Sequence, residues 1–304
     1  MPPTSGLSRP ARGDRLAIWL LPALTSLLLY GIGQGLVKQY IVEVPPARFC
    51  LYFVGAKAIL NLAYWGVNRQ TALYTEESAP FVALCLVAYL LDGTAWLLYF
   101  RAIVHGPISI VGTLSAAYPA LTVLFARAFL GEMMSAGQYC GITLVIAGCV
   151  GLSYSPSSGV GAPASRTWIP ASIVALLLWG ASSTLLKAAY GLPGADEVNV
   201  LIYNLVGAFL TLGIYGLVSG RGSTSGRGDW ARSFLPMGML AGGDIGFILA
   251  TRFGPVSLTT PLSGAYPLIT VIYARIVLQE RIGARQVLCV LAILGGMALL
   301  PGPG

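Results

Sequence analysis

Long apolar stretches follow one another along almost the whole chain, separated by short segments rich in polar residues, Pro or Gly. A helix that crosses a bilayer needs about 20 mainly apolar residues, and its backbone polar groups must be paired internally because lipid offers no partners. We therefore predict an all-α integral membrane protein with about ten transmembrane helices. The predicted spans are residues 16–37, 46–67, 79–103, 107–130, 135–154, 168–189, 198–218, 234–252, 255–278 and 284–300.

The composition agrees with this fold class. Of the 304 residues, 56% are hydrophobic and 10% are charged, whereas soluble domains carry roughly 25% charged residues. The net charge is +7, but the basic residues are scattered near the ends of apolar stretches, which indicates anionic lipid headgroups rather than nucleic acid. The five cysteines and single histidine show no zinc-ligand spacing, so we expect no metal site and no cofactor.

An internal duplication is the strongest signal within this pattern. LLYGIGQGLVK at residues 28–38 matches LLWGASSTLLK at residues 177–187, and SAAYPALTVLFARAFLGE at 115–132 matches SGAYPLITVIYARIVLQE at 263–280. The predicted organisation is a disordered N-terminal tail (1–15), a first five-helix unit (16–154), a linker (155–167) and a second five-helix unit (168–300).

An odd number of spans in each unit has a geometric consequence. If the first unit begins on one side of the membrane, the second must begin on the other side. The two units are then inverted repeats, related by a two-fold axis in the membrane plane. Inverted repeats are typical of secondary transporters, whose halves rock around a site near the bilayer midplane.

The repeated motifs also resemble those of a known family. A Gly-Pro pair before a span (Gly106-Pro107 and Gly254-Pro255), Tyr-Pro within it, and Leu-Gly-Glu or Leu-Gln-Glu at its end resemble the drug/metabolite transporter superfamily, EamA type. The resemblance covers nearly the whole chain, twice. It implies ten helices in the plasma (cell inner) membrane with both termini cytoplasmic. It also implies a central cavity lined by helices 1, 3, 4, 6, 8 and 9, and export or exchange of small metabolites such as amino acids.

The arginines give a different indication of orientation. Basic residues favour the cytoplasmic side, and their distribution favours the same orientation for both units, which an odd repeat does not allow.

Ionisable side chains inside spans are candidates for function, because a charge at the bilayer centre costs at least roughly 2.5–3.5 kcal/mol. Asp92 and Asp244 occupy near-equivalent positions in the two units. The alternative to a substrate contact is an interhelical pair, for example of Asp92 with Lys57 or Arg101. Lys57 aligns with Phe209, so we assign it an asymmetric task such as recognition of substrate charge; the alternative is a lysine that reaches the interface. The candidates for substrate binding or coupling are Lys57, Asp92, Asp244, Arg101 and Arg252.

Tyr-Pro pairs interrupt the fourth and ninth spans, and we predict helix kinks at Pro119 and Pro267. A proline frees a backbone carbonyl, and a freed group at membrane depth must face protein or water. The alternative to a polar cavity at these positions is a purely structural kink. The predicted cavity lining is Gln34, Trp96, Tyr99, Ser115, Tyr118, Trp179, Ser182, Ser183, Ser263 and Tyr266.

Small residues in the fifth and tenth spans, among them Gly137, Gly141, Gly295 and Gly296, predict close helix packing. The packing can join the two spans within the chain or form a homodimer.

These features lead to one functional hypothesis. The chain is a secondary transporter that moves a small polar metabolite, amino acid-like or anionic, by alternating access, as an exporter or exchanger. Its expected partners are membrane lipids and the small-molecule substrate. A lipid or amphiphile flippase of the same fold is the alternative. A membrane-embedded enzyme or receptor is less favoured, because the chain has one histidine and no GxSxG motif.

Overall fold

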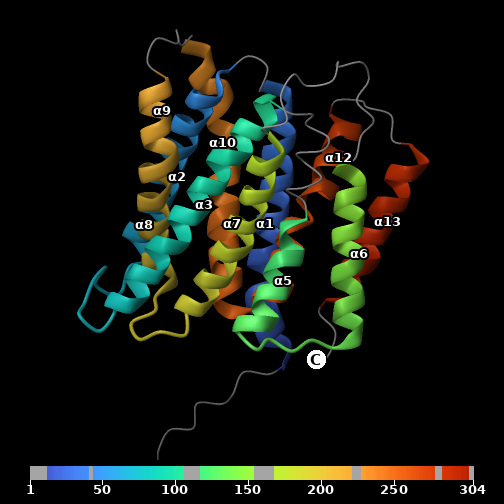
Figure 1. Ribbon diagram of the computed structural model, residues 1–304, viewed down its shortest axis with the longest axis horizontal. Helices are drawn as coiled ribbons and strands as arrows, with labels where there is room; N and C mark the ends of the chain where they lie inside the picture. Colours follow the sequence, from blue (N-terminus) through green and yellow to red (C-terminus); the bar gives the residue numbers. More distant parts are fainter. Residues whose placement is uncertain are drawn as a thin grey trace, which may run out of the picture.

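The computed structural model describes residues 12–40, 44–105, 117–153, 168–220, 227–277 and 283–300. All regular structure in these ranges is helical (Figure 1). The first unit consists of α1 (Arg12–Tyr40), α2 (Pro46–Asn68), α3 (Ala79–His105), α5 (Tyr118–Phe129) and α6 (Ala136–Ser153). The second unit consists of α7 (Trp168–Ala189), α8 (Glu197–Ala208), the π-helical turn η1 (Phe209–Gly213), α9 (Ile214–Ser219), α10 (Arg227–Phe253), α11 (Val256–Gly264), α12 (Tyr266–Ile276) and α13 (Ala284–Leu299).

The helices have the length and composition of a membrane protein. Within the described ranges, six helical segments are long and apolar enough to cross a bilayer: α1, α2, α3, α7, the continuous α8–η1–α9 segment, and α10. Three shorter apolar helices, α5, α6 and α13, accompany them. The predicted all-α membrane fold is confirmed, although residues 107–116 of the predicted fourth span lie outside the described ranges.

Two helices begin earlier than the apolar pattern predicts. α1 begins at Arg12 rather than at residue 16, and α10 begins at Arg227 rather than at residue 234. An apolar stretch reports only the part of a helix inside the hydrocarbon layer, and the helical backbone continues into the polar interface. Residues 1–11 of the predicted tail and the whole predicted linker lie outside the described ranges.

The ninth predicted span is broken rather than kinked. α11 ends at Gly264 and α12 begins at Tyr266, so Pro267 lies in the first turn of a new helix. Pro119 similarly lies in the first turn of α5. The first turn of a helix tolerates proline because its N–H groups have no intrahelical acceptor there. The residues that precede α5 lie outside the described ranges.

The packing of the helices has two-fold symmetry. α1 packs against α10 and α3 packs against α7, while α2 packs against α8 and α6 against α13. The equivalent helices of the two units are α1 and α7, α2 and α8, α3 and α10, and α6 and α13. Exchanging each helix for its equivalent turns the α1–α10 pair into the α3–α7 pair and leaves the other two pairs unchanged. In Figure 1, α1 runs upward and α7 runs downward, and the start of α1 lies at the same end of the bundle as the end of α13. The two units are therefore inverted.

Glycines allow α6 and α13 to approach closely within the chain. A Cβ atom added to Gly141 would lie 2.8 Å from the carbonyl oxygen of Gly296, and one added to Gly296 would lie 2.9 Å from the backbone nitrogen of Val145. Gly295 has nothing within 4 Å of such an atom. The contact between Gly141 and Gly296 thus joins the fifth and tenth spans of one chain, and a homodimer through these spans stays a prediction.

We expect Gly141→Ala to destabilise the protein by about 1–3 kcal/mol, because the added methyl group meets backbone that has no room to move. Gly295→Ala is the matched control, because it adds the same atom to open space and raises helix propensity by roughly 1 kcal/mol. Thermal unfolding of both variants in detergent micelles measures the difference. Equal stability of the two variants would contradict the packing argument.

Candidate functional site

A buried ion pair joins the two units. The Nζ atom of Lys57 on α2 lies 2.7 Å from Oδ2 of Asp244 on α10. Lys57 also donates a hydrogen bond to Oδ1 of Asn204 on α8 at 3.1 Å. The Lys57 side chain is 1% exposed and that of Asp244 is 13% exposed. A charge that is removed from water must be compensated by an opposite charge and hydrogen bonds. Asp244 and Asn204 provide this compensation for Lys57.

Further polar contacts surround the pair. The hydroxyl of Tyr30 on α1 donates to Oδ1 of Asp244. The Nδ2 group of Asn61 donates to the carbonyl oxygen of Leu201 at 3.0 Å and to Oδ1 of Asn204 at 3.2 Å. The Lys57 ammonium also lies 4.7 Å from the ring centroid of Phe53, within the range of a cation–π contact. The network therefore links α1, α2, α8 and α10.

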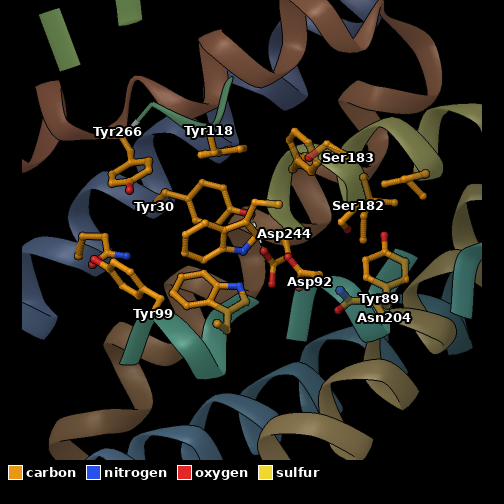
Figure 2. Close-up of a pocket in the computed structure, with 16 residues that line it drawn as sticks. Tyr30, Tyr89, Asp92, Tyr99, Tyr118, Ser182, Ser183, Asn204, Asp244 and Tyr266 are labelled. Carbon is orange, nitrogen blue, oxygen red and sulfur yellow. Dashed lines mark hydrogen bonds between the residues drawn. The ribbon is translucent and has the colours of Figure 1, made fainter. Parts of the chain in front are cut away.

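A cavity with a volume of about 80 Å³ lies between the two units (Figure 2). One water needs only about 10–15 Å³ by this measure, so the cavity has room for several waters or one small solute. Among the described residues, half of the lining is aromatic, and the two charged residues of the lining are both aspartates, with no Lys, Arg or His. The lining residues are Tyr30, Gln34, Tyr89, Asp92, Trp96, Tyr99, Tyr118, Trp179, Ser182, Ser183, Leu186, Asn204, Asp244, Phe247, Ile248 and Tyr266.

The duplication places two related half-sites in this cavity. Tyr30 and Trp179 occupy the same position in LLYG and LLWG. Tyr30 donates to Asp244, and its ring centroid lies 6.2 Å from that of Tyr266. The Trp179 side chain lies close enough to Asp92 to interact with its carboxylate, and its ring centroid lies 5.9 Å from that of Tyr118. Each half-site thus combines an aromatic residue of one unit with an aspartate and a tyrosine of the other. In Figure 2 the two aspartates lie near the middle of the group.

The two half-sites differ in charge compensation. Asp244 is paired with Lys57, whereas Asp92 has no Lys or Arg within ion-pair distance among the described residues. The position equivalent to Lys57 in the second unit holds Phe209. Lys57 and Asp244 act on Asp92 electrostatically through space. The cavity wall therefore carries one carboxylate without a directly bound cation.

Most of the residues selected from the sequence lie around the cavity. Those that line it are Asp92, Asp244, Gln34, Trp96, Tyr99, Tyr118, Trp179, Ser182, Ser183 and Tyr266. Lys57 does not line it but contacts Asp244, in the other unit, and not Asp92 as the interhelical alternative suggested. Ser115 lies outside the described residues.

Three selected residues lie away from the cavity. Ser263 is fully buried and its hydroxyl donates to the carbonyl oxygen of Ala23 at 3.5 Å. Arg101 is exposed, with its guanidinium 5.6 Å from the Tyr215 ring centroid. The guanidinium of Arg252 lies 3.3 Å from a carboxylate oxygen of Glu197. Both arginines lie near helix ends, where a long side chain extends away from the bilayer centre.

The sequence argument did not select six of the lining residues. They are Tyr30, Tyr89, Leu186, Asn204, Phe247 and Ile248. Tyr30 could have been found, because it lies in the repeated motif at the position of Trp179, which was selected. Asn204 is polar within an apolar helix, but its direction depends on how α8 packs against α2.

A second polar cluster holds the break between α10 and α11. The ammonium of Lys187 donates to the carbonyl oxygens of Thr251 at 2.9 Å and Gly254 at 2.7 Å. The Glu132 carboxylate accepts from the backbone N–H groups of Val256 and Ser257, both at 3.0 Å. The cation thus caps the C-terminus of α10 and the carboxylate caps the N-terminus of α11, as the helix dipoles favour.

We expect Lys57→Met to lower the free energy of unfolding by about 3 kcal/mol or more, because it leaves the Asp244 carboxylate without its buried partner. The double variant Lys57→Met/Asp244→Asn removes both charges and should recover part of this loss. Thermal unfolding in detergent measures both. Wild-type stability of the single variant, or no recovery in the double variant, would contradict this interpretation of the pair.

Comparison with known proteins agrees with this architecture. The model of the EamA-like transporter family matches the chain twice, at residues 17–154 and 166–301. A search of curated proteins gave no match. Several solved structures are similar in fold, and one crystal structure among them has a TM-score of 0.76 and 19% sequence identity, covering 95% of this chain and 98% of that chain. The chain therefore belongs to the EamA-like transporter family and is a multi-pass membrane transporter of the drug/metabolite transporter superfamily.

Proposed function

We propose that this protein is a secondary transporter that moves a small polar metabolite by alternating access, as an exporter or exchanger. The observation that carries the proposal is the cavity between two inverted units, lined by both. In each half-site, an aromatic residue of one unit contacts an aspartate of the other. Rocking of one unit against the other would therefore change both half-sites at once, which is what alternating access requires.

The lining supports an amino acid-like solute better than an anionic one. An anion in the cavity would face Asp92 and Asp244, and none of the described residues that line the wall is positively charged. Aromatic rings offer contacts to the apolar part of a solute, and the hydroxyls of Ser182 and Ser183 offer hydrogen bonds to a polar part. The volume of about 80 Å³ also supports a small metabolite rather than a lipid.

The break between α10 and α11 supports the proposed rocking of the two units, because it lets these helix ends change their relative position. Its ends are held by side chains of α7 and of the segment after α5, not by a continuous helix. Contacts of this kind can be released and made again as the units change their angle. In the proposed cycle, Glu132 links the first unit to the moving helix ends of the second.

We expect Ser183→Trp to reduce transport at least tenfold, because an indole at this position fills much of the cavity. The assay is counterflow of labelled amino acids into proteoliposomes that hold the purified protein and an excess of unlabelled amino acids. Ile173→Trp is the matched control, because Ile173 lies on the same helix and is 42% exposed on its outer surface. Size-exclusion chromatography and thermal unfolding establish that both variants are folded. Equal transport by the two variants would show that the solute does not pass through this cavity.

A further inference from the structure

We infer that the half-site around Asp92 binds the positively charged nitrogen of an organic amine or quaternary ammonium compound. The inference rests on the proposed transport function, since it assigns the charge of the solute at the same cavity. It narrows the solute from any small polar metabolite to one that carries a cationic nitrogen.

The charge of the cavity wall is the first argument. Lys57 is held at 2.7 Å by Asp244 and at 3.1 Å by Asn204, and it does not line the cavity. Asp92 lines the cavity, and among the described residues no cationic side chain lies within ion-pair distance of it. A carboxylate in an apolar, partly buried site gains from a cation that enters with the solute. An anion would gain nothing, because releasing Lys57 to meet it would leave Asp244 unpaired.

The aromatic residues beside Asp92 are the second argument. The side chain of Trp179 interacts with Asp92, and its ring centroid lies 5.3 Å from that of Trp96 and 5.4 Å from that of Tyr99. These rings are tilted or perpendicular to one another, at 80° and 59°, so they present both faces and edges to the cavity. The negative face of an aromatic ring attracts an ammonium group, most strongly for Trp. Aromatic rings around a carboxylate form a site that suits a cationic nitrogen.

The other half-site lacks these properties. Asp244 already has its cation, and the Tyr30 hydroxyl is donated to it. The cavity is therefore asymmetric, with one charged position left for the solute. A buried polar group supports this view: Tyr89 lines the cavity, the residue is 5% exposed, and its hydroxyl has no hydrogen-bond partner among the described residues. It can accept a hydrogen bond from an ammonium group or bond to a second polar group of the solute.

A pair of ligands of equal shape tests the charge directly. Choline and 3,3-dimethylbutan-1-ol differ only in having N⁺ or carbon at the branched centre. We expect choline to bind the purified protein at least tenfold more tightly than the neutral alcohol in isothermal titration calorimetry. Asp92→Asn should weaken choline binding at least tenfold and leave the alcohol unchanged. Asp229→Asn, at the start of α10 and away from the cavity lining, should leave both affinities unchanged.

A second variant keeps the test decisive if Asp92→Asn does not fold. Trp96→Leu removes one ring of the aromatic wall and should weaken choline binding more than binding of the alcohol. Trp230→Leu, at a position 53% exposed on α10, is its control. Equal affinity of the wild-type protein for the two ligands, or unchanged choline binding in both cavity variants, would overturn the inference. Succinate that binds more tightly than choline would overturn it as well.

The two proposals fail in different ways. If the protein catalyses amino acid counterflow but binds choline no more tightly than 3,3-dimethylbutan-1-ol, the cationic site is refuted and the transport function stands. Choline binding that depends on Asp92, without counterflow of any solute, would support the site and refute transport by alternating access.

Discussion

The ion pair of Lys57 and Asp244 is the interaction on which the arrangement of this protein depends. Each charge is costly in the membrane interior, and each comes from a different unit. A buried ion pair adds little net stability compared with apolar residues, but a buried charge left without its partner is strongly unfavourable. A docking of α2 against α10 that separated Lys57 from Asp244 would leave both charges unpaired, so the pair helps to specify how the two units meet. The hydrogen bonds of Tyr30 and Asn204 to its two members extend the same constraint to α1 and α8.

The same pair also breaks the symmetry that duplication created. Tyr30 and Trp179 each contact the aspartate of the opposite unit, and Tyr266 and Tyr118 each contact one of these rings. A strictly two-fold cavity would present two equal carboxylates. Because Phe209 stands where the first unit has Lys57, only Asp244 receives a lysine. The inverted scaffold thus remains symmetric while the chemistry of its centre does not.

The sequence predicted the fold well because its determinants are local. The apolar length of each span and the repeated motifs can be recognised from continuous stretches of sequence. The inversion follows from the odd number of spans in each unit. Most of the lining could also be predicted, because Tyr118 and Tyr266 occupy matching positions of the repeated Tyr-Pro motif and Trp179 lies in a second repeated motif. The partner of Lys57 could not be predicted, because it depends on which helices of the two units meet. Ser263 does not line the described cavity for a related reason: the break at Ala265 separates it from Tyr266, so residues three apart no longer share a helix face.

The helix break between α10 and α11 is held by side chains that belong to repeated motifs. Helix ends within a membrane protein need polar partners, and here Lys187 and Glu132 provide them from other helices. The motifs that contain these residues are repeated, with Lys38 and Glu280 at the matching positions. Because the units are inverted, α1 and α3 end at the opposite end of the bundle from α7 and α10 (Figure 1). The cavity that contains Asp92 and Asp244 is lined by residues of both units, so the two inverted sets of helices meet around one shared centre.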